Sequence, residues 1–188
     1  MSGKKRIIVA ITGASGAIYA VEFLTLLHRL GVEVHGIISS AGAKVLELEE
    51  GRGVESLQPL AQAWYEIDDF TAPVASGSAR FDAMVVLPCS MGTLAAIAHG
   101  FSGNLIHRAA DVTLKERRPL LLAVRETPFN RTHLTNMLTA HDAGVTIIPP
   151  LPAFYHRPAT VRELVDNYCG RLAEQLGVAV PDLPRWGG

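Results

Sequence analysis

The chain has 188 residues, of which 48% are hydrophobic and 19% are charged, and its formal net charge at pH 7 is −1. This length and apolar content are typical of a single globular domain with a substantial core. The balanced and dispersed charge excludes the strongly basic surface of a nucleic-acid-binding protein or of a protein that docks on an anionic membrane.

The amino-terminal residues lead directly into a short predicted strand, which is too short for a signal-peptide core or a membrane span. The two cysteines, Cys89 and Cys169, are well separated and match no paired-cysteine metal motif, so reduced thiols in a reducing compartment are expected. The seven histidines contain no His-Glu-x-x-His pair, which argues against a protein-bound metal. We therefore predict a cytoplasmic protein without a metal ligand set.

A glycine-containing turn lies between the first predicted strand, residues 6–12, and an apolar helix predicted over residues 18–30. The unbroken Ile/Val run is typical of a buried parallel strand. Gly13 and Gly16 allow the backbone to approach a ligand, and Ser15 can cap the helix or donate its hydroxyl. The N–H groups at the helix start favour a phosphate, although a tight turn needs glycine whether or not it binds anything.

The second strand, predicted over residues 32–39, ends in Ser39 and Ser40 without a carboxylate. Dinucleotide sites of the Rossmann type use a carboxylate there to bind the ribose, so NAD is disfavoured. A mononucleotide whose ribityl chain and phosphate contact small hydroxyl residues is compatible with this strand end. A helix is predicted over residues 41–50, and residues 54–79 are expected to form a surface excursion with short elements.

The clearest inner strand, residues 81–87, ends in a turn with two hydroxyls and a glycine at residues 88–93. Open parallel sheets bind ligands at the carboxyl ends of their strands, so this turn is a second candidate contact. Cys89 is interpreted as a small core residue, not as a nucleophile. A helix predicted over residues 104–117 follows, and Arg117–Arg118 are interpreted as helix termination and a solvated face.

The next inner strand, residues 120–124, delivers Arg125 and Glu126 to the same edge of the sheet. An ionisable pair at a ligand-binding edge is a candidate for acid–base work with phosphate anchoring. A structural ion pair between the two side chains is the alternative. A helix is predicted over residues 132–143 and a last strand over residues 145–148.

The proline-rich segment at residues 149–158 is stiff and holds aromatic and cationic side chains at low entropic cost. It could equally be a connector or a surface that docks another subunit. Thr160 begins a capping box for the last helix, and Arg171 borders the apolar stripe of that helix, where a cation either snorkels or pairs with an anion. In the tail, the large apolar surface of Trp186 should cover another part of the protein.

About five parallel strands thus alternate with helices, which the right-handed crossover rule places on both faces of the sheet. We predict a single-domain, three-layer, doubly wound α/β fold, Rossmann-like or flavodoxin-like, with a mostly parallel sheet. The domain is expected to span residues 1–188, with residues 181–188 closing over the site or over a neighbouring subunit.

Five stretches of the chain, in order, resemble the flavin prenyltransferases of the UbiX/Pad family, which make prenylated FMN for UbiD-type decarboxylases. The stretches that carry the resemblance are Gly13–Tyr19, Pro88–Leu94, Arg108–Leu120, Arg125–Pro128 and Pro149–Pro158. The resemblance covers nearly the whole chain and implies a homododecamer.

The resemblance also implies which residues bind the two substrates. The implied FMN-binding residues are Gly13, Ala14, Ser15, Ser39, Ser90, Met91, Gly92, Thr93 and Arg125. The implied residues for dimethylallyl phosphate, partly across subunit boundaries, are Lys115, Tyr155 and Arg171, with Glu49 and Trp186 nearby. Glu126 is the implied acid–base residue.

The reaction that the resemblance implies joins the dimethylallyl group to N5 of reduced FMN with loss of phosphate and then closes a ring onto C6. Ionising an allylic phosphate requires neutralisation of the leaving anion, which Lys115, Arg171 and the Tyr155 hydroxyl could supply without a metal. Our hypothesis is that Glu126, helped by the Ser15 hydroxyl, protonates the departing phosphate and later takes up the ring-closure proton.

Two rival functions share the flavin-binding turns. FMN-dependent cysteine decarboxylases resemble one another in a Pro-x-Ser-Ala-Asn-Thr turn, whereas this chain has Met91–Gly92 in place of Ala-Asn. The missing asparagine tells against decarboxylation. A non-catalytic flavin-binding or carrier protein would have no use for a second phosphate clamp of the kind implied by Lys115, Tyr155 and Arg171.

Overall fold

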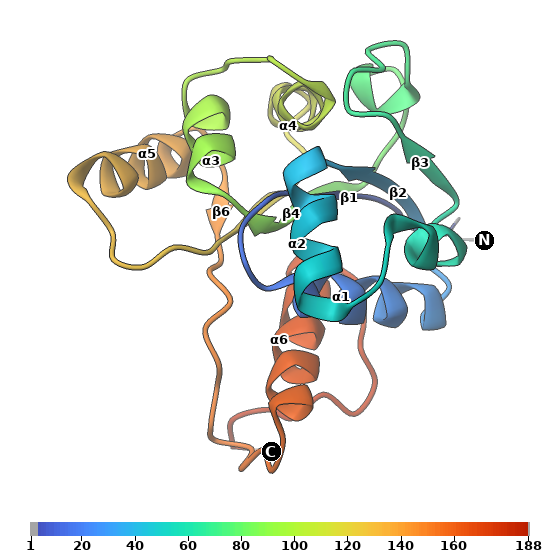
Figure 1. Cartoon of the computed structure of the whole chain (residues 1–188), viewed down its shortest axis with the longest axis vertical. Helices are drawn as coiled ribbons and strands as arrows, with labels where there is room; N and C mark the ends of the chain where they lie inside the picture. Colours follow the sequence, from blue (N-terminus) through green and yellow to red (C-terminus); the bar gives the residue numbers. More distant parts are fainter. Residues whose placement is uncertain (1–3, 188) are drawn as a thin grey trace.

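The computed structural model describes residues 4–187, so residues 1–3 and 188 of the predicted domain lie outside the described range. Within it, a six-stranded, all-parallel sheet is covered by helices on both faces (Figure 1). The elements, in chain order, are β1 (Arg6–Ile11), α1 (Ala17–Arg29), β2 (Glu33–Ile38), α2 (Ser40–Glu50), the 3₁₀ helix η1 (Val54–Leu60), β3 (Ala63–Tyr65), the 3₁₀ helix η2 (Pro73–Ala75), β4 (Ala83–Cys89), α3 (Met91–Ala98), α4 (Leu105–Lys115), β5 (Leu120–Val124), α5 (Arg131–Asp142), β6 (Thr146–Ile147) and α6 (Val161–Gln175).

The strand order is β3-β2-β1-β4-β5-β6, so the chain first builds the sheet in one direction from β1 and then returns to build it in the other. This is the Rossmann order and not the flavodoxin order, a choice that the sequence analysis left open. The direction of growth reverses between β1 and β4, which are paired from Ile7 with Ala83 to Ala10 with Val86. In open α/β sheets, ligands bind at such a switch point, outside the carboxyl ends of the strands.

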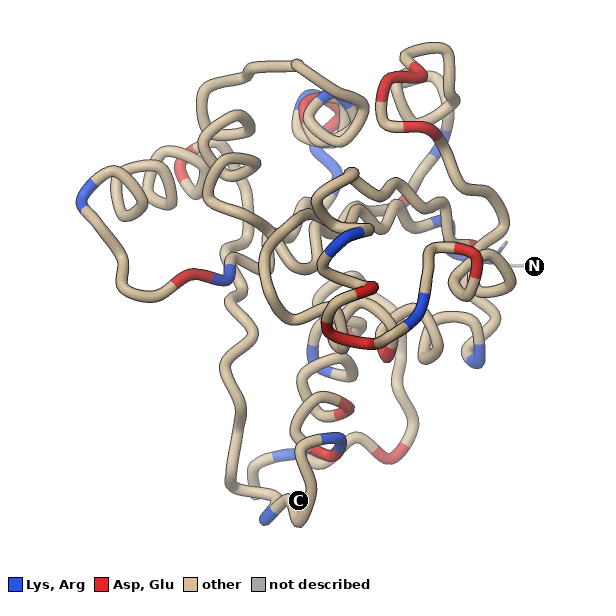
Figure 2. Tube along the Cα trace, in the orientation of Figure 1, with Lys and Arg blue, Asp and Glu red and all other residues tan. Residues whose placement is uncertain are grey.

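Alternate side chains of β1 enter two separate cores, because neighbouring residues of a strand point to opposite faces of the sheet. Ile7, Val9 and Ile11 pack with α1 and α6, whereas Ile8 and Ala10 pack with α3, α4 and α5. The predicted three-layer α/β fold is therefore confirmed. Lys and Arg are interspersed with Asp and Glu along the described trace, in keeping with the balanced composition (Figure 2).

The sheet has one strand more than the five predicted. The additional strand is β3, which lies inside residues 54–79, the stretch predicted to be a surface excursion with short elements. It has three residues and pairs at the edge of the sheet with residues 35–37 of β2. The close approach depends on Gly36, where a Cβ would lie 2.4 Å from Cε3 of Trp64. A short element was expected at residues 63–67, and the pairing with β2 shows that it is a strand of the sheet, which so short a segment cannot reveal by alternation.

The first helix begins differently from the expectation. Its N-cap is Gly16, at a φ of 113°, and this residue has no side chain of its own to cap the helix. Of the two roles expected for Ser15, capping this helix or donating its hydroxyl, the cap is not formed, because the left-handed residue that turns the chain into the helix is the next one along. The Ser15 hydroxyl instead hydrogen-bonds to Glu49.

The proline-rich segment leaves β6 and runs along the length of the molecule to the carboxyl-terminal segment (Figure 1). Within residues 4–187, no helix combines the length and the apolar character needed to cross a membrane. The same part of the chain contains no group of three or more His, Cys, Asp or Glu side chains placed to hold a metal ion.

Candidate functional site

A single hydroxyl ties together the two strands of the switch point. Thr12 follows β1 directly and is 3% exposed. Its Oγ1 donates to the carbonyl of Pro88 at 2.7 Å and accepts from the N–H of Ser90 at 2.9 Å. Thr12 is not among the site residues predicted from the sequence; the signal that could have found it is a hydroxyl residue between a buried strand and a glycine turn.

Two serines at this edge are held by helix capping. Ser39 is the N-cap of α2 and accepts from the N–H of Gly42 at 3.0 Å. Ser90 is the N-cap of α3, accepts from the N–H of Thr93 at 3.3 Å and donates to the Thr93 hydroxyl at 3.1 Å. Capping orients both hydroxyls and directs the positive ends of two helices to the carboxyl edge of the sheet, where they favour an anion.

The glycines of the two turns have different surroundings. A Cβ on Gly13 would lie 2.5 Å from Cβ of Ala41, so this glycine allows the first turn to pack against α2. A Cβ on Gly92 would meet no atom within 4 Å, so the turn after β4 is open beside its backbone. Ala14 is buried and Met91 is packed against the core on the α3 side, so both would present backbone groups to a ligand at this edge.

The start of α1 is bound by a carboxylate of the same chain. Oε2 of Glu49, in the last turn of α2, accepts from the N–H groups of Gly16 and Ala17 at 2.8 Å each. The first turn was expected either to offer its N–H groups to a phosphate or to be tight for steric reasons alone. In the structure, two of these N–H groups are bound by Glu49, because α2 returns its last turn to the start of α1. Arg125 lies beside this contact and donates from Nε to the carbonyl of Ser15 at 3.0 Å.

The pKa of Glu49 reflects this environment. Partial burial raises it, but hydrogen bonds from the Ser15 hydroxyl and from the N–H groups of Ala17 and Gly16, together with the Arg125 charge, outweigh burial and hold the pKa below its usual value. The Glu49 carboxylate is therefore ionised at neutral pH. Its negative charge lies near the positive charge of the Arg125 guanidinium, at the carboxyl edge of the sheet.

Arg125 and Glu126 follow β5, as predicted, and their side chains have different partners. The N–H of Arg125 donates to the carbonyl of Cys89 at 3.1 Å, which places the residue next to the turn after β4. Glu126 is exposed, and its Oε1 accepts from the N–H of Thr127 at 2.9 Å. Within residues 4–187, neither side chain forms an ion pair. The alternative expectation, a structural ion pair between Arg125 and Glu126, is therefore wrong.

The structure brings together three further predicted residues, near the end of the chain. The Tyr155 hydroxyl donates to the carbonyl of Pro184 at 3.1 Å, and its ring centroid is 5.9 Å from that of Trp186. Arg171 pairs with Glu174 at 2.6 Å, and Glu174 also binds Arg185. The tail thus folds back onto α6 and the proline-rich segment, although the Trp186 side chain remains 85% exposed.

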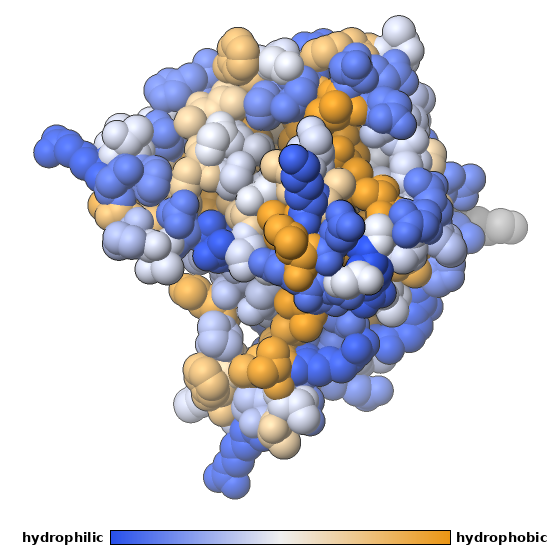
Figure 3. Space-filling model, in the orientation of Figure 1, coloured by the Kyte–Doolittle hydropathy of each residue, from blue (hydrophilic) through white to orange (hydrophobic). Residues whose placement is uncertain are grey.

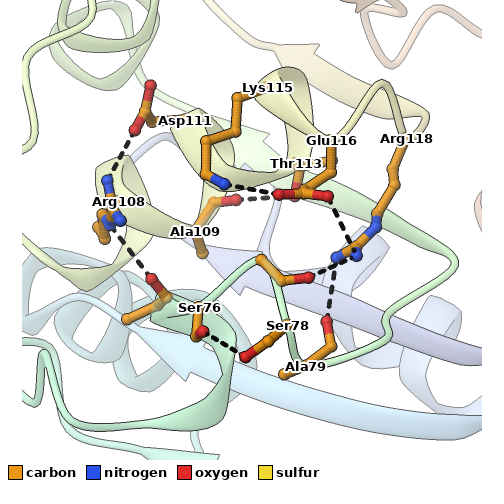
Figure 4. A network of polar contacts seen from close by, with 12 residues as sticks. Ser76, Ser78, Ala79, Arg108, Ala109, Asp111, Thr113, Lys115, Glu116 and Arg118 are labelled. Atoms are coloured by element: carbon orange, nitrogen blue, oxygen red, sulfur yellow. Dashed lines mark hydrogen bonds and ion pairs between the residues drawn. The ribbon is translucent and has the colours of Figure 1, made fainter.

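Lys115 lies apart from the switch point. It is the last residue of α4, and β5 begins five residues later, so Lys115 lies toward the amino edge of the sheet. Ser90 and Arg125 lie at the other edge, and β5 alone spans about 13 Å between the two edges. Nζ of Lys115 is 2.6 Å from Oε1 of Glu116 (Figure 4).

The neighbouring Arg118 was interpreted as helix termination and a solvated face. The first part is confirmed, because its N–H donates to the carbonyl of Thr113 at 3.0 Å, but the solvated face is wrong for its side chain. Its guanidinium donates to the carbonyls of Gly77 at 2.9 Å and Ala79 at 3.1 Å (Figure 4). The loop before β4 turns back to α4 in the folded chain, which gives this arginine two backbone acceptors that the local sequence cannot reveal. Arg117, in contrast, is exposed, as expected.

Large apolar side chains are exposed on the single chain, and Figure 3 shows a band of hydrophobic surface that includes α2. The residues with more than half of their surface exposed are Leu48, Phe101, Leu134, Leu138, Leu151, Phe154, Val161 and Trp186. Exposed apolar surface on this scale is typical of a chain that is covered by a partner.

Comparisons with known proteins agree on one family. The Flavoprotein family model matches residues 1–173. The flavin prenyltransferase UbiX of Deinococcus radiodurans is 47% identical over 98% of this chain and 95% of its own length. A crystal structure of AnUbiX (PadA1) in complex with FMN and dimethylallyl pyrophosphate is 44% identical, covers 99% of both chains and superposes with a TM-score of 0.96. A dodecameric FMN-dependent UbiX-like decarboxylase from Escherichia coli O157:H7 is 41% identical, with a TM-score of 0.94 over 97% of this chain and 100% of its own.

Proposed function

This chain belongs to the UbiX family of flavin prenyltransferases, and we propose that it joins a dimethylallyl group from dimethylallyl phosphate to reduced FMN and supplies the prenylated flavin to a UbiD-type decarboxylase. The observation that carries the proposal is that Ser15, Ser90 and Arg125 lie together at the β1–β4 switch point, with Glu126 as the next residue along the chain. An acid–base carboxylate beside a flavin-binding edge is what prenyl transfer needs and what a simple flavin carrier does not.

The residues at the switch point fit FMN. A ligand with a polar chain would fit this edge, because there is open space beside Gly92 and because the helix-capping hydroxyls of Ser39 and Ser90 lie here. A guanidinium has five N–H donors, and the Nε bond of Arg125 to Ser15 leaves others for a phosphate. When bound, reduced FMN supplies the nucleophilic N5 and C6 positions that take up the prenyl group.

The leaving phosphate needs cations and a hydroxyl, which this chain holds in two separate places. Tyr155 and Arg171 lie with the tail, whereas Lys115 lies at the end of α4. We infer that the clamp is completed between protomers of a homo-oligomer, whose contacts would also cover the exposed apolar side chains. Residues 181–187, with Trp186, would close over the donor and exclude water from the departing group.

Glu126 is the residue that moves a proton. Its carboxyl is exposed at the end of β5, free of any ion pair within residues 4–187, and is one residue from the Arg125 that anchors the flavin. We assign it protonation of the departing phosphate oxygen, with the Ser15 hydroxyl as its helper. Lys115, Tyr155 and Arg171 stabilise the negative charge that develops on the same phosphate.

The test is anaerobic incubation of the purified protein with reduced FMN and dimethylallyl phosphate, followed by mass spectrometry of the extracted flavin. We expect a mass gain of one five-carbon prenyl unit. Unmodified flavin with dimethylallyl phosphate and also with dimethylallyl pyrophosphate would overturn the transferase proposal. In that case, carbon dioxide release from peptidyl or pantothenoyl cysteine would identify the decarboxylase alternative.

A further inference from the structure

We propose that Glu116 is a positioning residue that holds the ammonium group of Lys115 where it meets the phosphate of the prenyl donor. This inference rests on the proposed function, because it concerns the donor clamp of the same reaction. Glu116 directly follows the last residue of α4, and in the described structure its carboxylate contacts Lys115 and Arg118 and lies against the loop at Gly77.

The first observation is a chain of contacts that runs from the backbone to Lys115. Arg118, whose side chain is 18% exposed, is fixed by the carbonyls of Gly77 and Ala79. Its Nη2 lies 3.9 Å from Oε2 of Glu116, and Oε1 of the same carboxylate lies 2.6 Å from Nζ of Lys115. The two oxygens of Glu116 thus connect Lys115, through Arg118, to the backbone of the loop at Gly77 and Ala79 (Figure 4).

The second observation is the glycine that faces the pair. A Cβ on Gly77 would lie 2.1 Å from Oε1 of Glu116 and 2.7 Å from Nζ of Lys115. The loop backbone therefore closes directly on the ion pair, and the absence of a side chain at this position leaves the space that the pair occupies. Glycine here has an ordinary negative φ, so space and not backbone freedom is the reason for it.

Restraint matters for this lysine because its side chain is 48% exposed. A free lysine side chain has about 2 kcal/mol of rotamer entropy at 25 °C, part of which is lost each time it binds a phosphate. A partner that has already ordered the side chain lowers that cost. The hydrogen bond and charge of Lys115 hold the pKa of Glu116 below its usual value, so the partner is ionised at neutral pH.

Positioning and simple electrostatics predict opposite results, which makes the role testable. A carboxylate near a phosphate binding site repels the donor, so its removal should tighten donor binding if charge alone matters. If Glu116 positions Lys115, its removal should weaken donor binding although the site becomes more positive.

The experiment uses the FMN-loaded full-length protein and compares the parent with Glu116→Gln, Glu116→Asp and Gly77→Ala. For Glu116→Gln we expect the KM and Kd for dimethylallyl phosphate to rise about 2- to 5-fold, the size expected for an exposed ion pair. The affinity for FMN should not change. Glu116→Asp, which keeps the charge, should recover part of the loss.

Glu50→Gln is the matched control, because it removes one carboxylate from another exposed pair, Glu50 with Arg52 at 3.2 Å, and should leave the KM for the donor unchanged. Gly77→Ala should raise that KM as Glu116→Gln does, and the double variant should show less than the sum of the two effects, because both act on one contact.

The inference would be overturned if the KM for the donor in Glu116→Gln were equal to or below that of the parent. It would also be overturned if Glu116→Gln and Glu50→Gln raised this KM equally, or if the parent did not bind dimethylallyl phosphate at all. A parent that binds the donor but does not prenylate FMN would contradict the proposed function instead. The Kd ratio between Glu116→Gln and the parent, measured by calorimetry, would still decide the positioning role.

Discussion

Thr12 shows how much a single buried side chain can contribute at the residue scale. Its hydroxyl connects β1 to the carbonyl of Pro88 and to the N–H of Ser90, and so sets the separation of the two turns for which we propose contact with the flavin. Thr12→Val keeps the shape but leaves both backbone groups without this partner. We expect a loss of about 1–3 kcal/mol in the free energy of unfolding, together with weaker FMN binding.

Urea unfolding and flavin titration measure these two effects. Thr113→Val is the control, because Thr113 is equally buried but donates to the carbonyl of Ala109 within its own helix. Its replacement should cost less stability and should leave FMN affinity unchanged. Equal effects of the two substitutions on FMN affinity would contradict the bridging role of Thr12.

Glu126 is the residue on which the proposed chemistry depends. Glu126→Gln keeps the size of the side chain and should bind FMN as the parent does, because no contact of the carboxylate joins it to Ser15 or to the turn after β4. Prenyl transfer in a single turnover should fall by about 10²- to 10⁴-fold, the usual contribution of a positioned acid–base group. Transfer at the parent rate would remove Glu126 from the mechanism.

At the scale of the element, the caps of α2 and α6 separate stability from function. Ser39 caps α2 at the ligand edge, and Thr160 caps α6 by accepting from the N–H of Glu163 at 3.2 Å. Each replacement by alanine should lower the free energy of unfolding by about 0.5–2 kcal/mol. Only Ser39→Ala should also weaken FMN binding, as measured by flavin fluorescence, because only Ser39 lies at the carboxyl edge of the sheet. A similar loss of FMN affinity in Thr160→Ala would show that the effect is general destabilisation.

The elements also show which local signals were sufficient. The Ile/Val runs of β1 and β4 and the apolar periodicity of α1 and α6 predicted these elements to within a few residues, because burial against a sheet leaves a strong imprint on the sequence. The start of α1 was less predictable. The N–H groups at its start donate to a carboxylate from the end of α2, more than thirty residues away, and no local pattern encodes that contact.

At the scale of the whole molecule, the position of Lys115 predicts complementation between protomers. If Lys115 and Arg171 of one site belong to different protomers, then Lys115→Ala and Arg171→Ala should each be inactive alone. In a randomly mixed oligomer of equal amounts of the two, about one quarter of the sites would have both residues intact. Co-expression followed by the flavin mass assay should therefore recover about that fraction of parent activity.

Two controls make the complementation decisive. The first control mixes Arg171→Ala with Tyr155→Phe. These two residues lie together in one chain, so if one protomer supplies both of them to a site, the two variants should not complement each other. Mixing after purification, without subunit exchange, should also give no recovery. If the co-expressed Lys115→Ala and Arg171→Ala proteins stay inactive, the donor clamp belongs to a single protomer.

The amino-acid sequence by itself determined the fold class, the order of most elements and the residue types at the ends of β1, β2, β4 and β5, because strand burial and turn chemistry are local properties. The tertiary structure alone decided the Rossmann strand order, the Thr12 bridge and the carboxylate of Glu49 at the start of α1. It also separated Lys115 from Arg125 and joined Lys115 to Glu116 and the loop at Gly77. These features depend on contacts between segments far apart in the chain, whose partners are chosen by packing and not by neighbouring residues.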